Sequence, residues 1–198
     1  MDQESTVRAS IGDSLATVAR TSTVDLAAKV RPAEPKDLVV VTTAAALEYG
    51  HAPRLVRLGV GRYLALTVDA GHVTGVTASP HLDALTLDQA LAAAAQAGEQ
   101  LRAAGWGGAP STMSDTVRSA ARGDSTGFFR AEVGRWTAGG DRAVIRIRQV
   151  ADAAPAGARA AERRYVLSVE FENPDVARRF GDMAVQAIER QRAARAPD

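Results

Sequence analysis

RYLALTVDAGHVTGVTA, residues 62–78, places Leu64, Leu66 and Val68 on one side of an extended chain, with a turn at 69–72. Apolar residues at every second position around a glycine-containing turn are typical of an antiparallel β-hairpin. Residues 86–104, TLDQALAAAAQAGEQLRAA, follow directly. Thr86 and Gln89 have the spacing of a capping box, so a helix is predicted from this point. The order is therefore a hairpin and then a helix.

The second half of the chain repeats this order of elements. Residues 129–172 predict three strands, the first two joined by a turn at 139–141. Asn173 and Pro174 then open a predicted helix over 174–194, because asparagine caps helices well and proline favours the first helical position.

These patterns predict an α+β fold, in which a mainly antiparallel sheet of five to seven strands carries the helices 86–104 and 174–194 on one face. Residues 38–43 and 54–58 add two further strands to the prediction. One interpretation is a duplicated β-β-β-α unit, with halves 38–106 and 111–194. The other is two unrelated halves that share a common layout.

The domain limits follow from composition. Residues 1–37 are polar and small and end in a proline-containing stretch, so we expect a flexible or lightly docked N-terminal arm. Within it, the spacing of Ile11, Leu15 and Val18 allows a short helix. Residues 38–198 are expected to form a single domain.

Large side chains are scarce, since aromatic residues make up 5% of the 198 positions. The rings expected in the core or at a subdomain seam are Tyr63, Trp106, Phe129, Trp136, Tyr165, Phe171 and Phe180. The formal net charge of +1 gives no overall field that would attract nucleic acid. The chain has no cysteine, which excludes disulfides and thiolate nucleophiles.

The location of the protein is left open between two alternatives. No apolar run reaches the roughly 18 residues of a membrane span. The start, MDQESTVRAS, lacks the order of a signal peptide. We expect either a cytoplasmic protein or a mature fragment whose leader or membrane anchor was replaced by an initiator methionine.

Residue patterns for catalysis or metal binding are missing from the sequence. His51, His72 and His81 are not at metal-ligand spacing, so a metal site would need them to converge with a carboxylate such as Asp69 or Asp83. There is no GxSxG or SxxK motif, and the glycines match neither a P-loop nor a dinucleotide fingerprint. We therefore expect no enzyme, no cofactor and no metal.

A row of arginines is the candidate site for a binding partner. Its members are Arg142, Arg146 and Arg148 on one strand face, joined by Arg130 and Arg135 from the neighbouring strand. Such a row can bind phosphate or an acidic protein. The alternative, which we favour, is cross-strand pairing with glutamates at 132, 170 and 172 on a solvated face. Aromatic residues do not interleave the row, which disfavours single-stranded nucleic acid.

Residues 61–106 resemble a group of known proteins. The stretch GRYLALTVDAGHVTGVT, followed by LTLDQAL and LRAAGW, is similar to small envelope-associated α+β accessory proteins of Gram-negative bacteria, including immunity proteins of contact-dependent secretion systems. The resemblance implies non-catalytic binding of another protein and a periplasmic or envelope location. Those proteins often carry a leader or lipid anchor, which this sequence does not show. The alternative function is a small-molecule or lipid carrier with an apolar pocket between helix 86–104 and the sheet.

Assembly is expected to involve the edges of the sheet. Strands as long as 142–148 and 165–171 need protected edges. We expect a homodimer or an edge-mediated contact with another protein, rather than a strict monomer.

Overall fold

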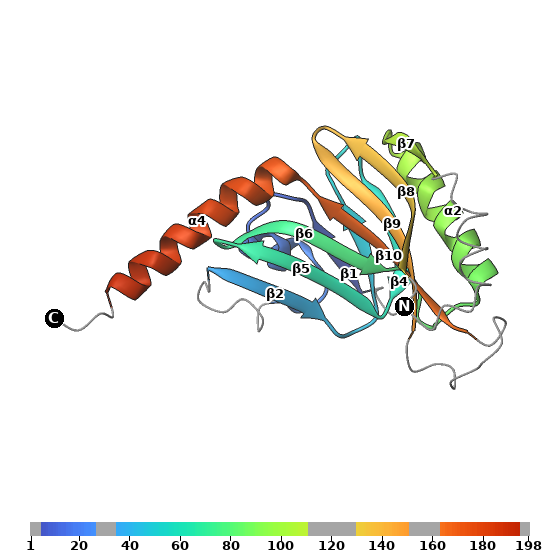
Figure 1. Ribbon diagram of the computed structural model, residues 1–198, viewed down its shortest axis with the longest axis horizontal. Helices are drawn as coiled ribbons and strands as arrows, with labels where there is room; N and C mark the ends of the chain where they lie inside the picture. The colour runs from blue at the N-terminus through green and yellow to red at the C-terminus, as the bar shows by residue number, and fades with distance from the viewer. Residues whose placement is uncertain (1–4, 27–34, 111–129, 151–162, 195–198) are drawn as a thin grey trace.

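The computed structural model describes residues 5–26, 35–110, 130–150 and 163–194 (Figure 1). The ring of Phe129, which the sequence placed in the core or at a subdomain seam, lies outside these residues. The elements in chain order are β1 (Thr6–Ala9), α1 (Leu15–Thr21), β2 (Lys36–Val41), β3 (Ala45–Tyr49), β4 (Val56–Gly61), β5 (Tyr63–Asp69), β6 (His72–Ser79), α2 (Leu87–Ala103), β7 (Gly107–Pro110), β8 (Arg130–Ala138), β9 (Asp141–Gln149), β10 (Tyr165–Glu172) and α4 (Pro174–Ala193).

The main sheet has seven antiparallel strands in the order β2-β5-β6-β10-β9-β8-β7. The predicted hairpin forms β5 and β6, and the second-half strands form β8, β9 and β10. The two halves join through the β6–β10 pair, in which Val169 lies opposite Ala78. The predicted α+β class and antiparallel sheet are confirmed.

The strands of the two halves have the same order about this central pair. β2-β5-β6 lies on one side and β10-β9-β8 on the other. Each helix crosses to the opposite half, since α2 packs on β8, β9 and β10 whereas α4 packs on β5 and β6. Figure 1 shows the two helices at opposite ends of the sheet.

The two helices do not share a face of the sheet, contrary to prediction. The side that carries Val68 and Val73 belongs to the main core, and we call it the core face. Its β5–β6 end is already occupied, because the core there includes Leu15 of α1. α4 therefore lies on the other side, the outer face, where the ring of Phe180 stacks on His72 at 4.2 Å. Because a repeated β-β-β-α unit would place both helices on one face, the repetition holds for strand order alone.

Residues 5–26 contribute to the core and are more than a loosely docked arm. β1 pairs in parallel with β3, which pairs with β4 in a second, three-stranded sheet. Val7 and Val18 are fully buried, and Leu26 nearly so. The short helix expected around residues 11–18 is present as α1. Strands β1, β3 and β7 were not predicted.

Aromatic rings fill the space between the two sheets. Tyr49 of β3 stacks on Phe171 of β10 with centroids 3.9 Å apart, and Trp106 contacts both rings. Five of the rings expected in the core are buried, namely Trp106, Trp136, Tyr165, Phe171 and Phe180. Tyr63 was wrongly placed there. It is 43% exposed, because it lies on the outer face at a part that α4 does not cover.

Candidate partner-binding face

All five arginines predicted as partner-binding lie on the outer face of the main sheet. The alternation of β9 buries Ala143, Ile145 and Ile147 in the core. It turns the three arginines of this strand, at positions 142, 146 and 148, to the other side. The cross-strand register then places Arg130 opposite Arg148.

Four of these arginines form ion pairs, three of them across strands and that of Arg135 within β8. The Arg146 guanidinium contacts the carboxylate of Glu170 and lies 3.9 Å from that of Glu132. Arg130 approaches Glu170 at 3.4 Å. Arg135 donates from Nε and Nη2 to the two oxygens of Glu132, each at 3.0 Å. This arrangement matches the interleaved pairing favoured from the sequence.

Arg148 differs from the other four. Arg142 pairs with Glu172 at 3.3 Å. Arg148 is exposed, and no acidic side chain within the described residues lies in salt-bridge range of its guanidinium. Within the described residues, Arg148 is therefore the one arginine of the row that has no acidic neighbour.

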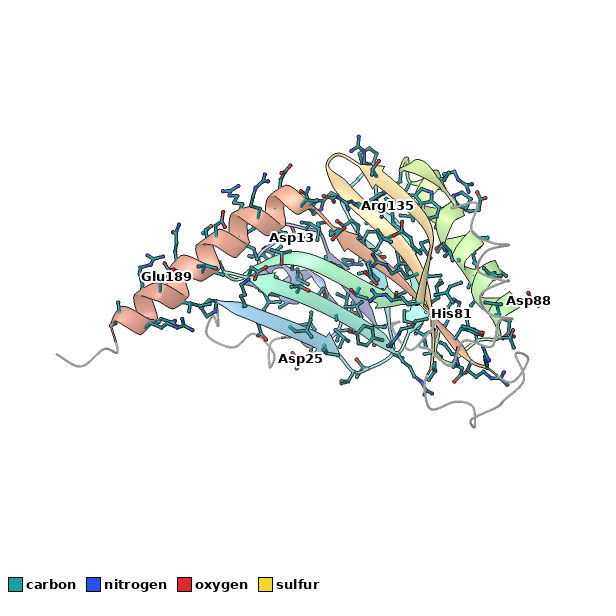
Figure 2. All side chains as sticks on the ribbon, viewed as in Figure 1. Asp13, Asp25, His81, Asp88, Arg135 and Glu189 are labelled. Atoms are coloured by element: carbon teal, nitrogen blue, oxygen red, sulfur yellow. The ribbon has the colours of Figure 1, made fainter. Side chains whose placement is uncertain are left out.

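A groove of about 390 Å³ crosses this end of the outer face. Its floor comes from β5, β6 and β10, one wall from arginines of β8 and β9, and the other wall from the segment after β6. The lining residues are Arg62, Tyr63, Thr77, Ser79, His81, Leu82, Asp83, Ala84, Arg130, Arg146, Arg148, Val166, Ser168 and Glu170. Figure 2 shows His81 toward the end of the sheet from which α2 begins, away from Arg135.

Backbone hydrogen bonds hold the second wall in place. Leu85 and Tyr165 exchange two hydrogen bonds of 2.8 Å, which fix the end of this wall to β10. The N–H of Arg62 donates to the carbonyl of His81 at 3.4 Å, which fixes its beginning. The wall is thus attached to the sheet at both ends.

The groove is electropositive. Four arginines and two carboxylates line it, which leaves an excess of two positive charges. His81 adds no charge at neutral pH, because partial burial lowers the pKa of its imidazole. The Asp83 carboxylate lies 3.9 Å from Arg62, and both side chains are exposed, so water screens this pair.

Exposed apolar side chains border the groove. Tyr63 and Leu82 line it and are 43% and 45% exposed, respectively. Leu38 of the edge strand β2 is 57% exposed on the same face, opposite Thr67. Large apolar residues beside arginine are common in protein interfaces.

His72 and His51 contact adjacent residues before α1, whereas His81 lines the groove. His72 Nδ1 lies 3.2 Å from the carbonyl oxygen of Gly12, and His51 Nε2 lies 3.6 Å from the Asp13 carboxylate. Within residues 5–26, 35–110, 130–150 and 163–194, no three histidine, aspartate or glutamate side chains come together as metal ligands would. None of the helices described is long and apolar enough to cross a bilayer.

The space expected for a carrier's pocket, between α2 and the sheet, is tightly packed. Ala90, Ala94, Ala97 and Leu101 are buried against the core. A Cβ atom added at Gly98 would lie 2.7 Å from Cζ2 of Trp136. The indole of Trp136 therefore fills the space that small residues leave on α2, and the groove lies on the opposite face.

Comparison with known proteins adds no assignment. No protein-family model matches the chain, and no curated protein or solved structure is significantly similar to it.

The sequence indicated the arginines of the groove but not its other wall. Arg62, Tyr63 and residues 81–84 meet β9 only because β6 pairs with β10. Alternation identifies the face of each strand but not which distant strand will lie beside it. Both walls of the groove could have been predicted only from a signal that β6 pairs with β10.

Proposed function

We propose that this protein is a non-catalytic binding module that recognises an acidic segment of another protein through the outer face of its main sheet. The observation that carries the proposal is the groove, with an excess of positive charge and one arginine, Arg148, that has no acidic neighbour among the described residues. A partner carboxylate would complete the charge pairing that the sheet begins.

The composition of the face supports a protein partner. Tyr63, Leu38 and Leu82 supply apolar contact area, and arginines supply directional donors. The ion-paired arginines are held by neighbouring glutamates, so less side-chain entropy is lost when a partner binds. Tyrosine and arginine are enriched among the residues that dominate protein interfaces.

The resemblance of residues 61–106 to envelope accessory and immunity-type proteins supports a bacterial partner from the cell envelope or a secretion system. In this proposal the chain acts in the periplasm or at the envelope, and neutralisation of a toxin is its most specific form. A cytoplasmic role remains the alternative location.

Affinity capture with a matched pair of variants tests the proposal. Tyr63→Glu places a carboxylate on the outer face, whereas Leu55→Glu makes the same change at a residue of similar exposure, 47%, that does not line the groove. We expect the wild type and Leu55→Glu to capture a stoichiometric partner from the source cells, and Tyr63→Glu to lose it. Equal capture by all three proteins would contradict a role for the outer face.

A further inference from the structure

We propose that the groove recognises a carboxylate side chain that stands next to a large apolar residue in the partner's segment, with Arg148 as the carboxylate-binding residue. This inference rests on the proposed function and names the chemistry that the outer face selects.

The cross-strand register places an apolar residue between the walls of the groove. Val166 of β10 lies opposite Arg148 of β9, and Arg148 lies opposite Arg130 of β8. Side chains in such pairs have Cβ atoms about 4.5–5.5 Å apart. A ligand carboxylate on Arg148 therefore brings its own chain within reach of Val166.

The contacts of Glu170 show how this surface binds a carboxylate. Its carboxylate contacts Arg146, lies 3.4 Å from Arg130 and lies 3.4 Å from the hydroxyl of Ser168. One carboxylate thus engages two of the arginines on this wall. Arg148 remains as the guanidinium to which a second carboxylate can bind in the two-bonded geometry that arginine favours.

The charges of the groove favour a carboxylate over a phosphate group. A phosphate monoester carries nearly two negative charges near neutral pH. Glu170 and Asp83 line the same groove and would repel the second charge. The excess of two positive charges is spread over four guanidinium groups, and Arg148 is the one without an acidic neighbour among the described residues, so a singly charged carboxylate on Arg148 is the ligand group.

The size and apolar lining define the rest of the ligand. A volume of about 390 Å³ is near the lower end of the range of small-ligand pockets, roughly 300–1,000 Å³. The groove therefore takes a few side chains and not a folded surface. Tyr63, Leu82 and Val166 line it together, which favours a leucine-sized residue beside the carboxylate.

The test uses blocked synthetic peptides and ¹⁵N-labelled full-length protein. The probe has one Leu–Glu pair within Gly-Ser flanks, and its matched versions carry Leu–Gln, Gly–Glu or Leu–phosphoserine. NMR titration follows the amides of Thr77, Ser79 and Ser168 in the groove. We expect the Leu–Glu peptide to shift these amides and to bind about tenfold more tightly than Leu–Gln, which loses one charge-assisted hydrogen bond. It should bind at least about tenfold more tightly than Gly–Glu, which loses the burial of a leucine side chain, and more tightly than Leu–phosphoserine, whose second charge faces Glu170 and Asp83.

Two variants distinguish a specific role of Arg148 from a general effect of arginine charge. Arg148→Gln should weaken binding of the Leu–Glu peptide by about tenfold. Arg178→Gln removes an exposed arginine of α4 that does not line the groove, and should change affinity less than twofold. Preserved spectral dispersion of each variant verifies that it is folded.

The possible outcomes distinguish failure of the proposed groove chemistry from failure of the proposed partner-binding function. Tightest binding of the phosphoserine peptide, equal affinity of wild type and Arg148→Gln, or no peptide binding at all would overturn the inference. Loss of partner capture in Tyr63→Glu together with no peptide binding would overturn the groove chemistry alone. Peptide binding that requires Arg148, with partner capture unaffected by Tyr63→Glu, would support the groove chemistry and contradict the proposed function.

Discussion

The hydroxyl of Tyr49 donates a 2.7 Å hydrogen bond to Oδ2 of Asp141, a residue 92 positions away. The other oxygen, Oδ1, accepts from the side-chain amide of Asn173 at 2.9 Å. Asn173 in turn caps α4 by accepting from the backbone N–H groups of Asp175 and Val176. One carboxylate thus connects the three-stranded sheet, the β8–β9 turn and the start of α4.

Removing this hydroxyl should destabilise the whole domain. Tyr49→Phe keeps the ring stacked on Phe171 but leaves Oδ2 of Asp141 without its donor. We expect a loss of about 1–3 kcal/mol in the free energy of unfolding, measured by urea titration. Tyr63→Phe removes a hydroxyl from an exposed ring and serves as the control, which should stay within about 0.5 kcal/mol of wild type.

The same pair predicts a response to alkaline pH. Burial first, and the hydrogen bond to Asp141 second, raise the pKa of Tyr49 far above its ordinary value. The unfolded chain therefore ionises this group at lower pH than the folded protein, and stability is lost as pH rises above about 10. Tyr49→Phe should lose less stability than wild type between about pH 9 and 11. An equal or steeper loss in the variant would contradict this assignment.

Two helical glycines should respond in opposite directions to alanine. At Gly98 an added Cβ would meet the Trp136 ring at 2.7 Å, so the gain in helix propensity of about 1 kcal/mol is offset by overpacking of about 1–3 kcal/mol. At Gly181 on α4 nothing lies within 4 Å of the added atom. We expect Gly98→Ala to lower the melting temperature and Gly181→Ala to raise it.

The difference in melting temperature between the two variants tests the packing of α2 on Trp136. If Gly98→Ala proved as stabilising as Gly181→Ala, the close packing of α2 on Trp136 would be wrong. An apolar cavity between α2 and the sheet, as the carrier hypothesis requires, would then regain support.

Local signals predicted some elements and long-range pairing determined the rest. The capping box at Thr86 and the Asn173-Pro174 pair marked both long helices, because capping depends on neighbouring residues. Strand β3 shows little alternation, since four of its five residues are buried, so no period of two was visible. The face on which α4 lies depends on what already covers the core face, which no local pattern records.

Part of the candidate site was likewise predictable from local sequence, and part depended on strand pairing. Alternation along β9 was enough to place its arginines on one face. That Arg148 has no acidic neighbour among the described residues was not predictable. This depends on which glutamates the neighbouring strands bring opposite each arginine. Glu170 could be recognised as the partner of Arg146 and Arg130 only once β10 was known to lie beside β9.

Phe180 should be the main attachment of α4 to the outer face. Its ring stacks on His72 at 4.2 Å, and Ala184 is the other buried residue of this helix. From Glu189 to Ala194 every residue is exposed, and Figure 1 shows this part of α4 extending past the sheet. Phe180→Ala should therefore cost about 3–5 kcal/mol, as for a buried ring, or less if α4 separates without unfolding the sheet.

Hydrogen–deuterium exchange distinguishes these two results. We expect the amides of α4 to exchange much faster in Phe180→Ala, with those of β9 and β10 unchanged under native conditions. Met183→Ala, at a residue 44% exposed, is the matched control and should leave α4 protected. Faster exchange throughout the sheet would show that α4 is an integral part of the main core.

His81 should make the stability of the groove wall sensitive to mild acid. Partial burial lowers the pKa of its imidazole below the ordinary value of about 6.5. The unfolded chain then binds this proton more readily than the folded protein does. The stability that the neutral imidazole contributes is therefore present above about pH 6.5 and is lost as pH falls below it.

His81→Gln removes this titration, so its melting temperature should fall less than that of wild type between about pH 7.5 and 5. An NMR titration of the His81 ring protons supplies the direct measurement, and a pKa at or above 6.5 would contradict both the burial of this side chain and its neutral state beside the four arginines of the groove.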